Sequence, residues 1–152
     1  MHSEQTDKFF SITPPAAIVD NASLTTATID TLGFNYCRVF VYYGAMDIAS
    51  TALKIQESDD SGMSGAADVT GLVYGTSSDI AGSTSALPSA TDDNKCFSFE
   101  IELKGRKRYL DLVATMGDGT TGSYVTAFAL LSRASDVPVT KTERGFANIL
   151  RV

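Results

Sequence analysis

The sequence predicts an all-β fold, a two-sheet antiparallel β-sandwich of about eight strands with jelly-roll-like connections. The first observation behind this prediction is a strict alternation of apolar and polar residues in residues 97–103. The second is the spacing of short β-branched or aromatic runs between clusters of Gly, Ser, Asp and Pro. The third is that few or no helices, and no repeat at a solenoid period, can be recognised.

The run at 97–103 sorts its side chains onto two faces, with Phe97, Phe99, Ile101 and Leu103 on one and Ser98, Glu100 and Glu102 on the other. After a short turn that contains Gly105, residues 109–116 form a second apolar run of strand length. We therefore expect the two runs to pair as an antiparallel hairpin. Because one face of this hairpin is apolar, another layer must cover it, which favours a sandwich.

The strongest single strand is expected at 36–43, where Arg38 is the one charged residue in a run that is otherwise apolar on both faces. One face of this strand should lie on the core and the other should be partly covered, for which a neighbouring subunit is a candidate. The Thr-rich run at 24–32 suits a half-exposed sheet. In chain order, the expected strands are 16–19, 24–32, 36–43, 51–56, 69–74, 97–103, 109–116 and 123–131.

These elements define one sandwich domain at 16–134, an N-terminal arm at 1–15 and a C-terminal tail at 135–152. Within the domain, residues 58–94 shift to Gly, Ser, Thr, Asp and Ala and form a long loop excursion. Loops of this length are usually functional or disordered, and an insertion without a function is the alternative. An immunoglobulin-like sandwich is the second candidate fold, weakened because the chain has no Trp and no paired Cys signature.

Composition restricts the classes of function. The chain has 152 residues and a net charge of -6 at pH 7, which disfavours a general affinity for nucleic acid. No run approaches the ~20 apolar residues of a membrane span, and the N-terminus lacks a signal-peptide pattern. We therefore expect a soluble protein that is made in the cytosol and has no nucleic-acid or membrane partner.

The two cysteines are expected to be free thiols. Cys37 shares a strand face with Val39 and Val41, whereas Cys96 alternates against the apolar face that contains Phe97. One thiol should therefore point inward and the other outward, which is incompatible with a disulfide between them.

Reactive residues form no catalytic constellation, so we expect no enzyme activity. The only histidine is His2, in the expected arm, and no Ser-His or Cys-His pair can be assembled without it. Glu100 and Glu102 lie on one strand face about 7 Å apart, a separation that resembles a glycosidase pair. Their neighbours Ser98 and Lys104 offer no aromatic platform for a sugar, so a solvated outer face is favoured.

We likewise expect no cofactor and no metal. The acidic pairs at 59–60 and 92–93, with Asp118, are candidates for calcium, but no EF-hand spacing is present and Asp is a common turn residue. The run GDGTTG at 117–122 lacks the lysine and the following helix of a phosphate-binding loop.

The basic turn at 104–108, KGRKR, is the one concentrated positive patch. A solvated hairpin tip is the favoured interpretation. Contact with an acidic protein surface and contact with nucleic acid are the alternatives, and the net charge opposes the last of these.

The runs IDTLGFNYCRVFVYYGAMDIASTALKIQESDDSG and LPSATDDNKCFSFEIELKGRKRYLDLVATMGDGTTGSYVTAFALLSRA, with phrases such as LKIQESDD and GRKRYL, resemble small virion proteins of tailed bacteriophages. The resemblance covers residues 24–134. It is to the capsid decoration, or cement, proteins, which are small β-sandwiches on the outside of the phage head. It implies no catalytic residues.

The resemblance implies a structural protein on the outer surface of the virion that stabilises the head by bridging subunits of the major capsid protein. A dimer or trimer is the implied self-assembly. The alternative is a carbohydrate- or receptor-binding β-sandwich module of a phage tail or fibre. A hydrolase that uses Glu100 or Glu102 is the third hypothesis.

Candidate interface residues come from the densest strand, the arms, the excursion and the basic turn. In the densest strand, ordinary core packing is the alternative to an interface. The candidates are Phe9, Phe10, Tyr36, Phe40, Tyr42, Tyr74, Arg106, Arg108, Phe146, Ile149 and Leu150.

Overall fold

The computed structural model describes residues 6–16, 18–135 and 140–150. These residues form eight strands, whose bounds are β1 Lys8–Thr13, β2 Ile29–Asp30, β3 Tyr36–Met46, β4 Ser50–Ser58, β5 Ala67–Val73, β6 Cys96–Glu102, β7 Tyr109–Met116 and β8 Ser123–Ser132. Among the described residues, no helix has the length and apolarity needed to cross a membrane.

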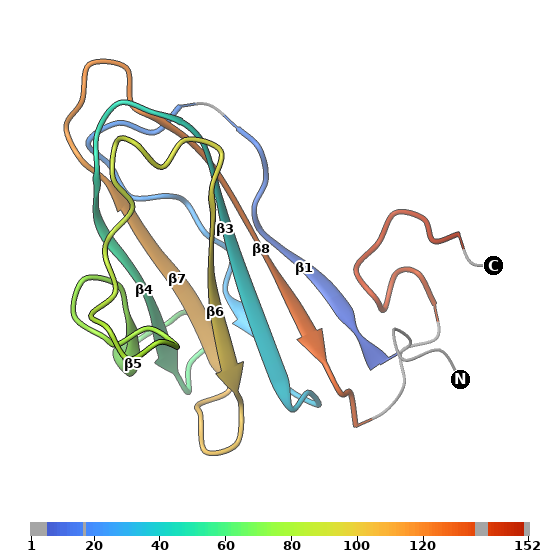
Figure 1. Cartoon of the computed structure of the whole chain (residues 1–152). Helices are drawn as coiled ribbons and strands as arrows, with labels where there is room; N and C mark the ends of the chain where they lie inside the picture. The colour runs from blue at the N-terminus through green and yellow to red at the C-terminus, as the bar shows by residue number, and fades with distance from the viewer. Residues whose placement is uncertain (1–5, 17, 136–139, 151–152) are drawn as a thin grey trace.

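The strands form two four-stranded antiparallel sheets (Figure 1). Sheet A has the order β1-β8-β3-β6, and sheet B has the order β2-β7-β4-β5. Pairs β1·β8, β2·β7, β3·β6 and β4·β5 are therefore nested about the middle of the chain, as in a long hairpin that is rolled up. This nested order is the jelly-roll topology, so the predicted fold class is confirmed.

The predicted hairpin between 97–103 and 109–116 is wrong, although both runs are strands. β6 pairs with β3 in sheet A, whereas β7 pairs with β2 and β4 in sheet B. The turn between them begins where the Leu103 N–H donates to the Asn35 C=O and ends where the Arg108 C=O accepts from the Thr31 N–H. The turn therefore crosses from one sheet to the other. Its length is sufficient to span the separation of about 10 Å between packed sheets.

Two other predicted strands are largely irregular. Of 24–32 only β2 is a strand, because the Leu24 N–H donates to Ala114 C=O in sheet B while the Ala27 N–H donates to Ile12 C=O in sheet A. Residues 24–28 therefore cross between the two sheets before the chain enters sheet B at β2. Of the described residues in 16–19, Val19 alone pairs, in an isolated bridge with Ser123.

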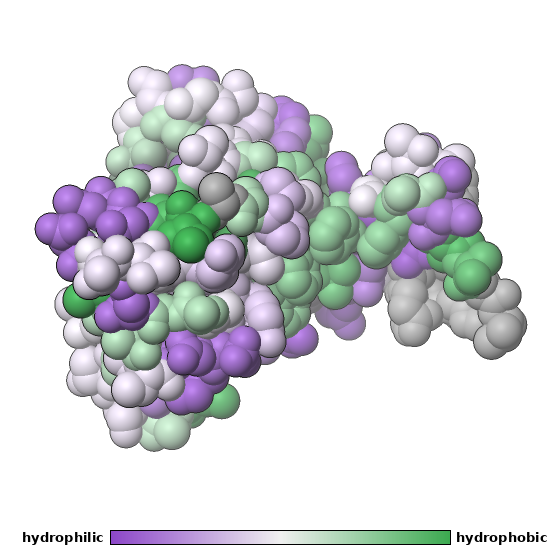
Figure 2. Space-filling model, turned by 90° about the horizontal axis from the view of Figure 1, so that it is seen from above, coloured by the Kyte–Doolittle hydropathy of each residue, from purple (hydrophilic) through white to green (hydrophobic). Residues whose placement is uncertain are grey.

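The segment predicted as an N-terminal arm contributes a strand to the domain. β1 pairs with β8 at the edge of sheet A, with Ile12 buried in the core, while residues 1–5 lie outside the described residues. The C-terminal segment, residues 140–150, packs on β1, since the Phe9 N–H donates to the Arg144 C=O at 2.8 Å. In Figure 2 this segment forms a lobe beside the body of the sandwich.

The core lies between the sheets and follows the predicted alternation. Leu53 and Ile55 of β4 are fully buried, as is Tyr43 of β3, whose hydroxyl accepts a hydrogen bond from Ser50 at 3.2 Å. Burial raises the pKa of Tyr43 to about 12, so the phenol stays neutral. Cys37 is buried and Cys96 is exposed, and both are free thiols, as predicted.

The excursion at 58–94 contains β5 and then a long connection to β6 that spans the open edge of the sandwich. Tyr74, just after β5, donates a hydrogen bond from its hydroxyl to the Ser98 C=O at 2.9 Å. Pro88 is buried, and the Ser50 N–H donates to its carbonyl. The excursion is thus anchored at both sheets.

Candidate functional site

Phenylalanine rings stack across the outer face of sheet A, on the side away from the core. Phe40 of β3 stacks on Phe128 of β8 with ring centroids 5.0 Å apart, and Phe128 contacts Phe9 of β1 at 5.5 Å. Phe146 of the C-terminal segment continues the row on Phe9 at 5.4 Å. All four rings are half-buried. We call these residues, with the three tyrosines described next, the aromatic band.

Tyr36, Tyr42 and Tyr124 extend the band along β3 and β8. Tyr42 is 43% exposed and Tyr124 is 50% exposed, and both line a shallow, mainly apolar pocket of about 130 Å³ with Pro15 and Ala16. They face outward because their neighbours Val41, Tyr43 and Val125 are buried. Tyrosine combines a large contact area with a polar group, as residues at protein interfaces commonly do.

Three guanidinium groups lie beside rings of the band, and one of them, that of Arg144, lies 5.9 Å from the ring centroid of Phe146. Arg133 lies 5.4 Å from the ring centroid of Tyr36, and Arg38 lies 5.9 Å from that of Phe40. Arg38 also pairs with Glu100 across the β3·β6 ladder at 2.9 Å. The surface therefore combines tyrosine, phenylalanine and arginine, residue types that are enriched at protein interfaces.

The predicted interface residues fall into several groups. Five of them belong to the aromatic band, namely Phe9, Phe40, Phe146, Tyr36 and Tyr42. The three that lie in β3 therefore face away from the core between the sheets. Phe10 points to the opposite face of β1 and packs against the core, so it lies outside the band.

The remaining predicted interface residues lie outside the aromatic band. Tyr74 is in the pocket described below. Ile149 is half-buried, and Leu150 is 93% exposed, so the C-terminal segment gives Leu150 little apolar cover. Phe128 and Tyr124 were not among the predicted interface residues, and the signal that could have found them is their shared parity along 123–131.

The basic turn at 104–108 is largely neutralised by acids. Arg108 forms two hydrogen bonds with Asp30, at 2.8 and 2.7 Å, and these bonds are the main reason why the pKa of Asp30 is lowered. Arg106 pairs with Glu57 and Lys107 pairs with Asp59, both at 3.5 Å. Arg106 and Arg108 thus link the turn to sheet B rather than form a free cationic patch.

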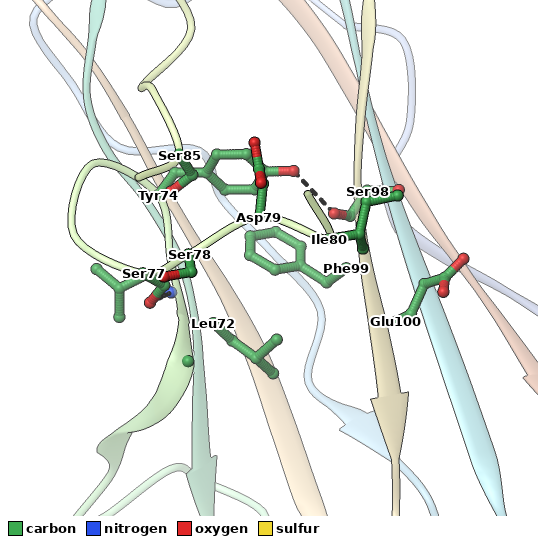
Figure 3. Close-up of a pocket in the computed structure, with 12 residues that line it drawn as sticks. Leu72, Tyr74, Ser77, Ser78, Asp79, Ile80, Ser85, Ser98, Phe99 and Glu100 are labelled. Atoms are coloured by element: carbon green, nitrogen blue, oxygen red, sulfur yellow. Dashed lines mark hydrogen bonds between the residues drawn. The ribbon is translucent and has the colours of Figure 1, made fainter. Parts of the chain in front are cut away.

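A pocket of about 430 Å³ lies between β6, the end of β5 and the connection that follows (Figure 3). The rings of Tyr74 and Phe99 meet edge-on at 5.2 Å. Burial raises the pKa of Tyr74, which keeps its hydroxyl protonated as the donor to Ser98. The lining residues are Gly71, Leu72, Val73, Tyr74, Ser77, Ser78, Asp79, Ile80, Ser85, Ser98, Phe99 and Glu100.

The acidic pair at 92–93, which the sequence offered for calcium, serves local structure, and so does Asp47. Asp92 accepts hydrogen bonds from Lys95 and Ser89, which lower its pKa to about 2, and the Asp93 carboxylate accepts from the Met46 N–H. Asp47 accepts three backbone N–H groups of the turn at 117–122, and these lower its pKa. The described part of the chain holds no group of three potential metal ligands. His2 lies outside it.

Neither the family models nor the curated proteins compared with this chain match it.

Proposed function

We propose that the chain is a non-enzymatic structural protein of a tailed-phage virion that decorates the head and bridges subunits of the major capsid protein. The observation that carries the proposal is the aromatic band, an outward aromatic surface on a sandwich whose core is already closed. Solvent-facing aromatic clusters of this kind are typical of protein-binding surfaces. The resemblance of residues 24–134 to decoration proteins supplies the identity of the partner.

A decoration protein acts by binding the mature shell in preference to its alternatives. A subunit that contacts two neighbouring capsid proteins stabilises the arrangement that it binds by mass action. Since many copies bind one head, modest individual contacts are sufficient. In this role the protein is made in the host cytoplasm, self-associates as a dimer or trimer and ends on the outer surface of the capsid.

The location of the protein tests this role directly. Particles from the phage that encodes the chain would be reconstructed by electron cryo-microscopy, and density for a jelly roll is expected at regular positions outside the head. Density on the tail or fibres, or none on the particle, would refute the decoration role.

A double variant, with a matched control, tests whether the aromatic band binds the capsid. Replacing Tyr42 and Tyr124 by serine removes two half-exposed rings of the band, and central aromatic residues of an interface often contribute about 2 kcal/mol or more each. We expect binding to undecorated heads to weaken at least about tenfold. Leu32→Ser, at an exposed apolar residue outside both the band and the pocket at β6, is the matched control and should bind normally. Equal binding by all variants would contradict the assignment.

A carbohydrate- or receptor-binding module is the second candidate. The observation that favours it is the pocket at β6, which combines the Tyr74 ring with Ser77, Ser78 and Asp79. Polar groups around an aromatic ring suit a sugar or a polar peptide. A glycan array distinguishes the two roles, because saturable binding that Tyr74→Ala abolishes would favour the module over the decoration protein.

A further inference from the structure

β6 is an edge strand of sheet A, and its outer side carries no further strand. Toward β3, the Tyr43 N–H donates to the Lys95 C=O at 3.0 Å and the Leu103 N–H donates to the Asn35 C=O at 2.9 Å. In an antiparallel ladder the hydrogen-bonded pairs alternate, so the odd-numbered residues of this strand bond to β3. The backbone N–H and C=O groups of Ser98, Glu100 and Glu102 therefore point away from the sheet.

Little covers this row of backbone groups. The Tyr74 hydroxyl donates to the Ser98 C=O, which confirms the outward direction of this carbonyl. Among the described residues, no hydrogen bond uses the backbone of Glu100 or Glu102 on this side. The 430 Å³ pocket adjoins the edge at Ser98 and Glu100, and Figure 3 shows it between β6 and the connection after β5. The edge is thus open to a ligand.

The other sheet edges are less suitable for pairing. The edge of β1 is covered where the Phe9 N–H donates to the Arg144 C=O. β2 has only two residues, and β5 has an irregular register between Asp68 and Val73. Short or bulged edge strands resist pairing with another chain, whereas a regular seven-residue edge such as β6 permits it.

We propose that β6 binds an extended, basic segment of a partner protein, which adds to sheet A as a fifth strand. The partner's backbone would pair with Ser98, Glu100 and Glu102 in the way that β-strand addition generally works. Its inward side chains would enter the pocket beside Leu72 and Phe99, so alternate residues are apolar.

Charge complementarity favours basic side chains at the remaining positions of the partner strand. Glu100 and Glu102 are exposed on the outer face of β6, and Glu102 has no ion-pair partner among the described residues. Lysine or arginine at the opposing positions of the added strand would complement them, and the net charge of -6 favours a basic partner at longer range. A second copy of the chain is disfavoured, since pairing β6 with itself gathers the glutamates of both copies in one ribbon.

This inference does not depend on the decoration role, because it concerns an edge strand and not the aromatic band. The probe is a capped heptapeptide of alternating lysine and valine, and the readout is the backbone amide spectrum of the whole ¹⁵N-labelled protein. We expect saturable shifts and slower hydrogen exchange at the amides of Ser98, Glu100 and Glu102. The same peptide with glutamate in place of lysine should not bind.

Two variants separate backbone pairing from charge. Ser98→Pro removes an N–H that sheet A does not use, and proline is tolerated on an edge strand, so the fold should persist while peptide binding is lost. Glu102→Lys should weaken binding of the lysine peptide by about threefold to tenfold. Asp118→Lys, with the same charge change on an exposed turn, is the control and should bind as the parent does.

Several outcomes would overturn the inference. These are no saturable binding at millimolar peptide, shifts confined to the aromatic band, equal binding of the two peptides, or full binding by Ser98→Pro. Protection of the β6 amides in a peptide-free dimer would show that a second copy occupies the edge. Binding of a neutral saccharide in the pocket without binding of the peptide would also reject it. Failure of the peptide leaves the virion experiment unaffected, so the two proposals can fail separately.

Discussion

Replacing Gly145 by alanine should release the C-terminal segment from the edge of β1. Gly145 has φ +78°, and a β-carbon at this position would lie 1.8 Å from the carbonyl oxygen of Phe9. No side-chain rotation relieves a contact between a β-carbon and backbone, so the segment must move by more than an ångström. That movement breaks the hydrogen bond from the Phe9 N–H to the Arg144 C=O and separates the Phe9 and Phe146 rings.

The size of the effect follows from these two contacts. A backbone hydrogen bond contributes about 1 kcal/mol and an aromatic pair contributes about 1 kcal/mol, so undocking becomes easier by about 2 kcal/mol. This corresponds to a rise of roughly 30-fold in the undocked fraction. The sandwich itself should keep its stability, because the described segment packs on β1 and contributes no strand to either sheet.

Trypsin cleavage at the Arg144–Gly145 bond measures this opening. Arg144 is only 6% exposed, so the docked segment protects the bond. The cleavage rate, normalised to that of the unfolded chain, should rise by roughly 30-fold in Gly145→Ala. Gly105→Ala is the control, since it has a similar φ of +79° but no atom within 4 Å of the added carbon. A rate for Gly145→Ala that matches this control would refute the reasoning.

Three further outcomes are expected. Ile55→Ala should lower the free energy of unfolding by about 2–5 kcal/mol in a denaturant titration, because the side chain is fully buried, and a loss below about 1 kcal/mol would contradict the packing. A thiol reagent should label only Cys96 in the native protein, since Cys37 is buried with its pKa raised to about 12, and rapid modification of two thiols would contradict this. Arg108 lowers the pKa of Asp30 in the folded state, so this carboxylate adds stability above its unfolded pKa of 3.8 and loses that contribution as pH falls through its folded pKa. Acid titrations of unfolding should therefore be less steep in Asp30→Asn, and identical slopes would argue against the pair.

Sequence alternation predicted which side chains face the core but not which strands are neighbours. It placed Phe99 and Ile101 inward and Cys96 outward, as observed. The partner of residues 97–103 was missed because a period-two pattern looks the same whether the next strand pairs beside it or faces it across the core. The bonds of Leu103 to Asn35 and of Arg108 to Thr31, which direct the turn across the sandwich, join residues distant in sequence.

The candidate site was predicted in part for the same reason. Tyr36, Phe40 and Tyr42 were found because they share one face of a single strand. Phe128 lies on another strand, and only the β3·β8 register, which pairs it with Phe40, brings the two together. The pocket depends on the path of the irregular connection after β5, for which no periodic pattern exists.

The position of β8 has a consequence for how the chain is made. β8 lies between β1 and β3, so β1 pairs with a strand that leaves the ribosome only after β2 to β7 have done so. Until residue 132 emerges, the apolar side chains of β1 and β3 lack their neighbour and sheet A cannot be completed. Nascent chains that stop before β8 should therefore depend on chaperones, and C-terminal truncations that reach it should aggregate rather than yield a smaller folded domain.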